Sequence, residues 1–259
     1  MTIVPCRMKS TRLPGKAIRP IYGVPSIERC LLNTLAITRS AATVLATSTH
    51  PDDTVLERHN LDGRVAVVRG SEDDVLQRFF VAIEQLEADI VVRVTGDCPV
   101  VSYEIAGLLI ETHLQTGADV TYCRWGEFPP GINSEVYSVT ALRKLKELMP
   151  DTSYSEYLIL FFKNNPGHFR LNEVSVPDLY RHPEWRLTLD ESVDLELFEL
   201  LFSTLDIGRE PVPFERIAQF FADNPAAVGI NADAAIKYVD NNELAQFLTQ
   251  ATTIKGDGN

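Results

Sequence analysis

The sequence has few cysteines and no long apolar run. Its four cysteines lie far apart and form no Cys-x-x-Cys pair, which argues against a disulfide framework or a zinc site. No apolar run approaches the ~18 residues of a membrane-spanning helix. Cations also stand where the apolar core of a signal peptide would lie. We therefore expect a reducing, cytoplasmic location and no membrane partner.

Basic residues are scarce as well, and several catalytic motifs are missing. Lys and Arg number 24 against 36 Asp and Glu, a net charge of −12, which argues against a nucleic-acid partner. A Walker A loop would need Gly at Ser10 and Ser or Thr at Ala17, and no Gly-x-Gly-x-x-Gly follows the first apolar run. Gly-x-Ser-x-Gly is absent, and the five histidines show no metal-ligand spacing.

The opening segment is basic throughout, against this acidic background. No Asp or Glu precedes Glu28. The loop that follows the short apolar run Ile3-Val4 contains four cations: Arg7, Lys9, Arg12 and Lys16. A strand that ends in a basic, glycine-containing loop is typical of α/β proteins that hold a polyanion such as a nucleoside triphosphate. The alternative is a solvated basic loop that binds nothing.

The first half of the chain alternates short apolar runs with amphipathic segments. Strands are predicted at residues 43–47, 65–68, 89–94 and 119–122, and helices at 51–59, 75–86 and 102–115. This alternation predicts an α/β fold with a mainly parallel, doubly wound sheet and helices on both faces.

After Trp125 the alternation becomes less regular. We expect strands near residues 135–138, 169–174 and 185–189, helices near 141–148, 155–164 and 192–202, and short helices over the last fifty residues. The length of 259 residues fits one domain covering 1–259. Within it, the segment 125–183 is a candidate lid or dimerisation arm.

Two carboxylates follow predicted strands. Asp97 comes after the strand 89–94, and Asp190 comes after the strand 185–189. Ligands of an open parallel sheet lie at the carboxyl ends of its strands, and Mg²⁺ prefers one or two carboxylates together with phosphate oxygens and water. We therefore expect Asp97 and Asp190 to lie close together at neighbouring strand ends. The alternative for Asp190 is the N-cap of the helix that begins near Ser192.

The basic loop also carries a resemblance to a family. The segment Val4-Pro-Cys-Arg-Met-Lys-Ser-Thr-Arg-Leu-Pro-Gly-Lys16 resembles the nucleotide-binding signature of the CMP-sugar synthetases, the cytidylyltransferases that activate KDO and sialic acids. The likeness is closest to the spore-coat-polysaccharide type. Three further motifs of that type follow in the expected order: Arg69-Gly-Ser-Glu-Asp-Asp-Val-Leu76, Arg93-Val-Thr-Gly-Asp-Cys-Pro99 and Arg186-Leu-Thr-Leu-Asp190.

The resemblance implies a fold and a reaction. The fold is the Rossmann-like sheet of the nucleotide-diphospho-sugar transferases. The reaction is the transfer of CMP from CTP to an acidic or unusual sugar for surface glycans, by in-line attack of a sugar hydroxyl on the α-phosphorus, with Mg²⁺ and release of pyrophosphate. A homodimer is expected. The alternatives are a nucleotide-sugar-dependent glycosyltransferase, whose common Asp-x-Asp motif is missing near Asp97, and a non-catalytic homologue.

The resemblance also assigns residues. The implied catalytic residues are Arg7, Lys16 and Asp97. The implied magnesium ligands are Asp97 and Asp190. The implied nucleotide-binding residues are Arg7, Met8, Lys9, Ser10, Arg12, Lys16, Ser48, Arg69, Gly70 and Ser71. The implied sugar-binding residues are Thr95, Glu135 and Tyr157.

The sequence departs from the family pattern at three positions and at its start. Lys9 stands where relatives carry Gly, so a side chain occupies the closest approach of the backbone to phosphate. Thr95 replaces the Gln of the KDO and sialate enzymes, which argues against those two acceptors. Tyr157 stands where close relatives have His. The opening strand is shorter than usual, which suggests a native start upstream of Met1.

Overall fold

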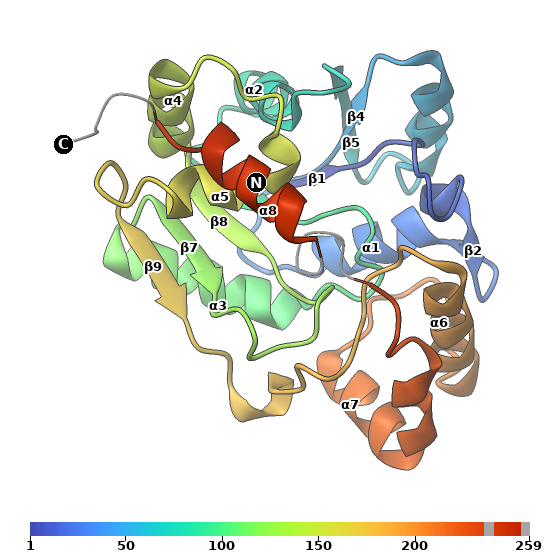
Figure 1. Cartoon of the computed structure of the whole chain (residues 1–259). Helices are drawn as coiled ribbons and strands as arrows, with labels where there is room; N and C mark the ends of the chain where they lie inside the picture. The colour runs from blue at the N-terminus through green and yellow to red at the C-terminus, as the bar shows by residue number, and fades with distance from the viewer. Residues whose placement is uncertain (236–240, 255–259) are drawn as a thin grey trace.

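A seven-stranded sheet forms the centre of the computed structural model, which describes residues 1–235 and 241–254. The strand order is β5-β4-β1-β6-β8-β7-β9 (Figure 1). The strands are β1 (Thr2–Pro5), β4 (Thr43–Ser48), β5 (Ala66–Gly70), β6 (Ile90–Arg93), β7 (Val120–Cys123), β8 (Glu135–Ser138) and β9 (Leu171–Val174). A separate hairpin pairs β2 (Pro20–Ile21) with β3 (Val24–Pro25).

The sheet is mainly parallel, as the alternation predicts. β1 pairs in parallel with β4 and β6, β4 with β5, and β7 with β9. Only β8 is antiparallel to its neighbours β6 and β7. The connection from β7 to β8, residues 124–134, contains no helix. Parallel neighbours need a long crossover, so β8 returns in the opposite direction.

Helices cover both faces of the sheet. The α-helices are α1 (Ser26–Leu35), α2 (Val75–Leu86), α3 (Tyr103–Thr116), α4 (Val139–Leu148), α5 (Leu158–Lys163), α6 (Ser192–Thr204), α7 (Phe214–Asp223) and α8 (Asn242–Ala251). The 3₁₀-helices are η1 (Lys16–Ile18), η2 (Pro51–His59), η3 (Ser155–Tyr157), η4 (Asp178–Tyr180) and η5 (Pro225–Ile230).

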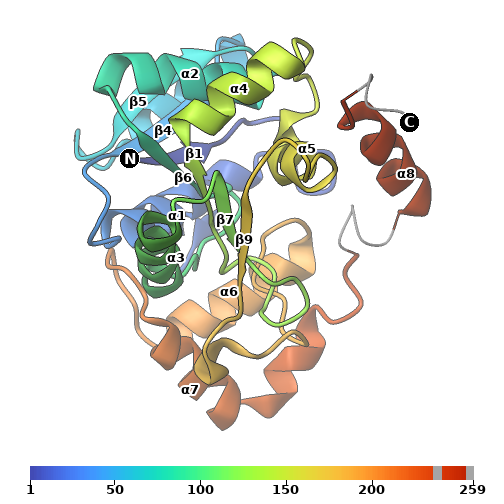
Figure 2. The same ribbon diagram turned by 90° about the vertical axis from the view of Figure 1, so that its left-hand side faces the viewer.

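Alternate residues of each strand point into two separate cores. In β1, Val4 packs with the side chains of α1, α3, α6 and α7, whereas its neighbour Ile3 packs with those of α2, α4 and α5. Figure 2 shows these two groups of helices on opposite sides of the sheet. Both faces are therefore buried, which explains why the parallel strands are apolar runs rather than alternating patterns. The prediction of a doubly wound sheet is confirmed.

Two elements differ from the sequence prediction. Helix α1 lies in a stretch for which the patterns predict no helix, and Pro25 rather than a capping side chain stands at its N-cap position. The segment 185–189 is not a strand. Its amides donate to two unrelated loops, Leu187 to the carbonyl of Pro130 (2.8 Å) and Leu189 to that of Asp97 (2.8 Å), so it has no single partner strand with which to form a ladder.

The segment 125–183 forms part of the central sheet. It contributes β8, between β6 and β7, and the edge strand β9. Its role as a lid or dimerisation arm stays a prediction. Helix α8 packs against this segment. The rings of Phe247 and Tyr154 have their centroids 5.1 Å apart, and the side chain of Asn165 donates to the carbonyl of Thr252 (2.8 Å).

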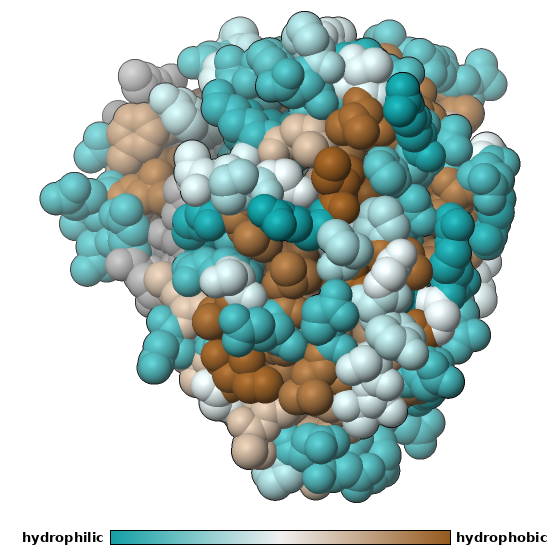
Figure 3. Space-filling model, turned by 90° about the vertical axis from the view of Figure 1, so that its right-hand side faces the viewer, coloured by the Kyte–Doolittle hydropathy of each residue, from teal (hydrophilic) through white to brown (hydrophobic). Residues whose placement is uncertain are grey.

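The surface carries both hydrophobic and hydrophilic side chains. Hydrophobic side chains lie among hydrophilic ones on the side that carries β2 and α6 (Figure 3). Tyr22, next to β2, and Leu200, on α6, are exposed. None of the helices in the described ranges combines the length and the apolar character needed to cross a membrane.

Candidate functional site

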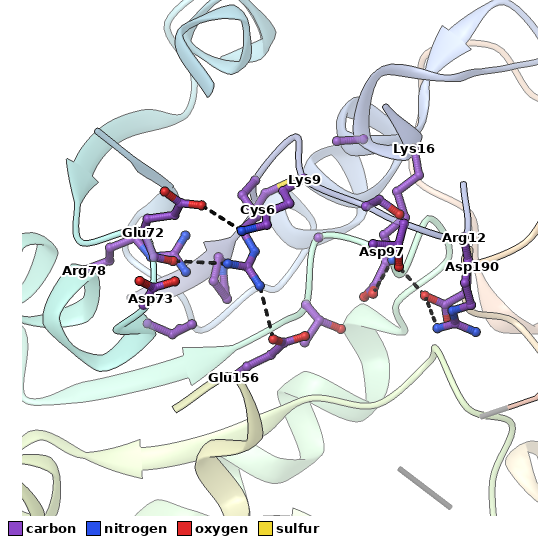
Figure 4. Close-up of a pocket in the computed structure, with 18 of the residues that line it drawn as sticks. Cys6, Lys9, Arg12, Lys16, Glu72, Asp73, Arg78, Asp97, Glu156 and Asp190 are labelled. Atoms are coloured by element: carbon purple, nitrogen blue, oxygen red, sulfur yellow. Dashed lines mark hydrogen bonds and ion pairs between the residues drawn. The ribbon is translucent and has the colours of Figure 1, made fainter. Parts of the chain in front are cut away.

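A cavity of about 360 Å³ opens where the loops after β1 and β6 meet (Figure 4). The loop after β1 lines it with five predicted residues: Arg7, Lys9, Ser10, Arg12 and Lys16. The loop after β6 contributes Thr95, Gly96 and Asp97. A side chain at Gly96 would collide with β1, because a Cβ there would lie 2.9 Å from the Cβ of Cys6 and 3.1 Å from the carbonyl oxygen of Pro5. Glycine therefore lets the two loops approach each other.

Asp97 and Asp190 lie side by side at one end of this cavity. The ammonium of Lys16 donates to Oδ2 of Asp97 (2.9 Å) and to Oδ1 of Asp190 (2.8 Å) (Figure 4). These two carboxylate oxygens therefore cannot be further apart than the sum of the two distances. The prediction that the two residues meet is confirmed, although Asp190 follows an extended segment rather than a strand.

The contact between Lys16 and Asp97 shifts the pKa of both residues. Burial alone would raise the pKa of Asp97, but the charge of Lys16 and hydrogen bonds from Lys16 and Thr95 outweigh it and lower the pKa to about 2. Burial would lower the pKa of Lys16, but the carboxylates of Asp97 and Asp190 outweigh it and raise that pKa. Lys16 and Asp97 are therefore both charged at neutral pH.

The side chain of Asp190 does not cap the next helix, because its neighbours Glu191 and Asp194 do so. It lies in the cavity instead, in contact with Lys16. Glu191 is the N-cap of α6, and Asp194 completes the capping box. The buried carboxylate of Asp194 accepts from the amides of Asp190 (2.8 Å) and Glu191 (2.9 Å) and from Arg186 (2.8 Å). The alternative of Asp190 as the N-cap is therefore wrong.

A buried carboxylate, which the sequence patterns did not single out, holds the basic loop. The amide of Met8 donates to Oδ1 of Asp53 (2.7 Å), and the hydroxyl of Ser48 donates to the other oxygen of Asp53. Asp53 and Met8 line a second cavity of about 510 Å³ together with His50 and Asp52. The two cavities share Arg7, Lys9 and Glu72.

Four predicted nucleotide-binding residues do not line either of these two cavities: Ser48, Arg69, Gly70 and Ser71. Ser48 lies behind Asp53. Arg69 pairs with Glu57 (2.7 Å) and donates to the carbonyl of Ser48 (2.8 Å). A Cβ at Gly70 would collide with the side chains of Gln77 and Arg78. This group therefore supports the walls of the cavities rather than facing their interior.

Of the predicted sugar-binding residues, only Thr95 lines the first cavity. Glu135 lies behind Arg93, with which it pairs at 2.9 Å, and it accepts from the hydroxyl of Tyr137 (2.5 Å). Burial and the charge of Glu156 raise the pKa of Tyr157 to about 12, and Arg12 acts in the opposite direction. Tyr157 is the last residue of η3 and follows directly on Glu156, which lines the first cavity.

Arg78 and Arg93 are cavity residues that the sequence analysis missed. Arg78 is 2% exposed and donates to the carbonyl of Ala46 (3.1 Å), but its Nε has no hydrogen-bond partner. The Nε of Arg93 also has none. No ion pair joins Arg78 to a carboxylate of the described chain. Burial, followed by the charge of Arg7, lowers the pKa of Arg78. The signal was an arginine on the apolar face of the helix predicted at 75–86.

Three carboxylates line the same end of the cavity: Glu72, Asp73 and Glu156. Arg7 pairs with Glu156 (3.4 Å) and donates to the carbonyl of Glu72 (3.3 Å). The Lys9 side chain is 68% exposed, and its ammonium pairs with Glu72 at 3.3 Å. Lys9 therefore points to solvent at the boundary between the two cavities.

A basic loop, two adjacent carboxylates and a mainly parallel sheet define this class of protein as an α/β nucleotidyltransferase. The family model of the cytidylyltransferases matches residues 1–208, and the chain belongs to this family. It is a CTP-dependent nucleotidyltransferase. The spore coat polysaccharide biosynthesis protein SpsF of Bacillus subtilis is 34% identical over 209 residues, which cover 77% of this chain and 85% of SpsF.

Solved structures share the fold. A cytidylyltransferase from Leptospira borgpetersenii superposes with a TM-score of 0.79 at 24% identity, over 91% of this chain and 97% of its own. The synthetase of CMP and 2-keto-3-deoxy-manno-octonic acid, in complex with CTP, gives a TM-score of 0.60 at 18% identity, over 78% of this chain and 98% of its own. At these identities the likeness concerns the fold alone.

Proposed function

We propose that this protein transfers CMP from CTP to a hydroxyl of an acidic or unusual sugar and releases pyrophosphate. The observation that carries the proposal is the cation between two carboxylates, Lys16 between Asp97 and Asp190, in a cavity lined by the basic loop. The names of the relatives supply the acceptor class, since one acts in polysaccharide biosynthesis and another joins CMP to a sugar acid.

The donor set fits a magnesium ion. Asp97 and Asp190 already hold one cation at hydrogen-bond distance, the ammonium of Lys16. No group of three or more His, Cys, Asp or Glu suited to a metal occurs within residues 1–235 and 241–254. Two carboxylates completed by phosphate oxygens and water are what Mg²⁺ prefers. When bound, the ion would neutralise the charge that develops on the phosphates.

The residues of the chain have separate tasks in this proposal. Arg7, Ser10, Arg12 and Lys16 bind the triphosphate, and Lys16 stabilises the departing pyrophosphate. The sugar hydroxyl attacks the α-phosphorus in line with the departing pyrophosphate. The protein therefore needs to orient the two substrates and neutralise the phosphate charge, and it forms no covalent intermediate. Met8 and Lys9 bring the loop backbone to the nucleotide.

The base and the sugar lie toward the other end of the cavity. The guanidinium of Arg78 lines this end without a carboxylate partner in the described chain, and Glu72 and Asp73 are acceptors of the same cavity. The edge of cytosine offers both kinds of group, with O2 and N3 as acceptors and the amino group as donor. Ser48, Arg69, Gly70 and Ser71 act from behind this end. Thr95, Glu135 and Tyr157 remain the proposed sugar-binding residues.

Membership of the cytidylyltransferase family argues against the two alternatives, a nucleotide-sugar-dependent glycosyltransferase and a non-catalytic homologue. The exposed Lys9, paired with Glu72, speaks against a lysine that fills the cavity. A cytoplasmic location and a homodimer also belong to this proposal. They rest on the composition and on the resemblance to the CMP-sugar synthetases.

The test is pyrophosphate release with CTP and a panel of acidic sugars. UTP and ATP serve as nucleotide controls, and neutral sugars as acceptor controls. We expect release that depends on CTP, on one acidic sugar and on Mg²⁺. Transfer of the sugar from a preformed CMP-sugar to a second acceptor, with release of free CMP and without use of CTP, would favour the glycosyltransferase instead.

A further inference from the structure

The Lys16 ammonium occupies the position between Asp97 and Asp190 that a divalent cation would take. Its distances to the two carboxylate oxygens are 2.9 and 2.8 Å. We propose that Lys16 closes this position to free metal ions and that the triphosphate of the bound nucleotide opens it by drawing the ammonium away. The inference rests on the proposed function, because it takes the two carboxylates as metal ligands.

The charges around the two carboxylates disfavour a free divalent ion. Asp190 contacts Arg12 (3.1 Å) and Arg186 (3.3 Å) in addition to Lys16. Arg12 is also paired with Glu191 (3.2 Å) and Arg186 with Asp194 (2.8 Å), so of these three cations Lys16 is the one that pairs with both Asp97 and Asp190. A metal ion that enters alone must displace an ammonium that is hydrogen-bonded to both of its ligands. A nucleoside triphosphate favours this displacement, because its negative charges attract the ammonium.

The Lys16 side chain can exchange its hydrogen-bond partners while the backbone of the loop keeps its conformation. The backbone at Lys16 is fixed, since its amide donates to the carbonyl of Leu13 (3.1 Å) and its carbonyl accepts from the hydroxyl of Ser26 (2.7 Å). The side chain is long and flexible. Rotation of the side chain alone is therefore enough to move the ammonium from the carboxylates to a phosphate in the same cavity.

The consequence is coupling between nucleotide and metal. If CTP removes the ammonium from the carboxylates, CTP strengthens metal binding, and by thermodynamic reciprocity the metal strengthens CTP binding by the same factor. Metal ions without nucleotide should bind weakly, even though both ligands are already in place. The structure thus predicts that the ion and the nucleotide enter together.

The experiment measures Mn²⁺ binding by electron paramagnetic resonance of the free ion, with the full chain. Samples with CTP are compared with CTP alone, so that binding of the ion by the nucleotide is subtracted. We expect the wild type to bind Mn²⁺ weakly without CTP and at least ~10-fold more tightly with it. Without CTP, Lys16→Met should bind Mn²⁺ roughly 10–100-fold more tightly than the wild type, the range typical of changes next to metal ligands.

Arg19→Met is the matched control. It removes one positive charge near Lys16 in the sequence, but Arg19 is exposed, lies outside both cavities and donates to the carbonyl of Pro14 (3.3 Å) rather than to the two aspartates. Its Mn²⁺ affinity without nucleotide should stay within about twofold of the wild type, because its charge is exposed and screened. Lys16→Gln repeats the measurement with a neutral polar side chain, and circular dichroism checks that both Lys16 variants are folded.

Two outcomes would overturn the inference, and they differ. If the wild type without CTP binds Mn²⁺ as tightly as Lys16→Met and Lys16→Gln, Lys16 does not close the site, but the metal site itself stands. If Lys16→Met combined with Asp97→Asn binds Mn²⁺ as tightly as Lys16→Met alone, Asp97 is not a ligand. In that case the magnesium role in the proposed function fails together with the inference.

Discussion

The two ends of the cavity balance their charges differently. At one end, the carboxylates of Asp97 and Asp190 are paired with cations of the protein, Lys16 above all. At the other end, Arg78 is buried without a carboxylate partner in the described part of the chain, and its Nε makes no hydrogen bond. The first end must exchange protein contacts for substrate contacts, whereas the second end has a buried cation that no carboxylate of the described chain neutralises. The difference predicts opposite consequences of mutation for stability and for binding.

The largest effect is expected at the balanced end. Asp97→Asn removes a negative charge that we assign to the metal and leaves the size of the side chain unchanged. The rate of pyrophosphate release with CTP should fall by roughly 10²–10³-fold, the range for loss of one group that stabilises transition-state charge. Asp151→Asn is the control, because Asp151 is an exposed aspartate that bonds only to Ser153. A loss below tenfold in Asp97→Asn would contradict the assignment.

Arg78→Met tests the unbalanced end. The affinity for CTP should fall by roughly 10–100-fold, since a charge-assisted hydrogen bond contributes about 1.5–3 kcal/mol. The free energy of unfolding should stay unchanged or rise, because the substitution removes a buried charge that no carboxylate of the described chain neutralises. Isothermal titration with CTP and urea unfolding measure the two effects.

Arg58→Met is the control for Arg78→Met, because Arg58 is an exposed arginine outside both cavities. It should change neither quantity. If Arg78→Met destabilises the fold while CTP affinity stays the same, Arg78 is a structural residue, and the contrast between the two ends is wrong.

Lys16→Met should destabilise the fold at neutral pH, in contrast to Arg78→Met. The two carboxylates then lie close together without the ammonium, which should lower the free energy of unfolding by about 1–3 kcal/mol. The pKa of Asp97 in the folded variant would then exceed its unfolded value, so the lost stability should return as the pH falls through that raised pKa. Urea unfolding of variant and wild type at pH 7 and pH 5 provides the measurement. A larger deficit at pH 5 than at pH 7 would argue against this explanation.

The wild type should show the opposite dependence on pH. Asp97 has a pKa of about 2 in the folded protein, below the unfolded value of about 3.9. Its contribution to stability, at most roughly 2.5 kcal/mol, is therefore complete above pH ~5 and is lost as the pH falls from ~4 toward 2. The stability difference between the wild type and Asp97→Asn, followed from pH 6 to pH 2, should shrink over that window. A difference that stays constant would rule out the Lys16 contact as its cause.

The smallest effect is expected at Lys9, between the two ends. Lys9→Gly breaks an exposed ion pair with Glu72, which is worth less than about 1 kcal/mol. The affinity for CTP should fall by no more than ~3-fold at low salt, and the loss should disappear at high salt because exposed charges are screened. Titration at two salt concentrations decides the point. A gain in affinity would instead identify Lys9 as a block to the nucleotide.

Local patterns in the sequence determined the architecture and one end of the cavity. Alternating apolar runs and amphipathic segments predicted the doubly wound sheet, because each pattern reflects burial of a strand or of one helix face. The run of cations before Glu28 predicted the basic loop. Asp97 and Asp190 were recognisable because each follows an apolar run, and in such sheets ligands bind at the carboxyl ends of strands.

Only the tertiary structure decided how these charges pair. Lys16 and Asp190 are 174 positions apart in the sequence, so their contact depends on the packing of distant loops. The same packing hides Arg69 and Glu135 behind the cavity walls and brings Asp53 to the amide of Met8. Arg78 lies on a helix face that the sequence marks only as apolar. The sequence shows which residues are charged. Which opposite or like charge lies next to each of them depends on residues that are distant in the sequence, and no local pattern contains those residues.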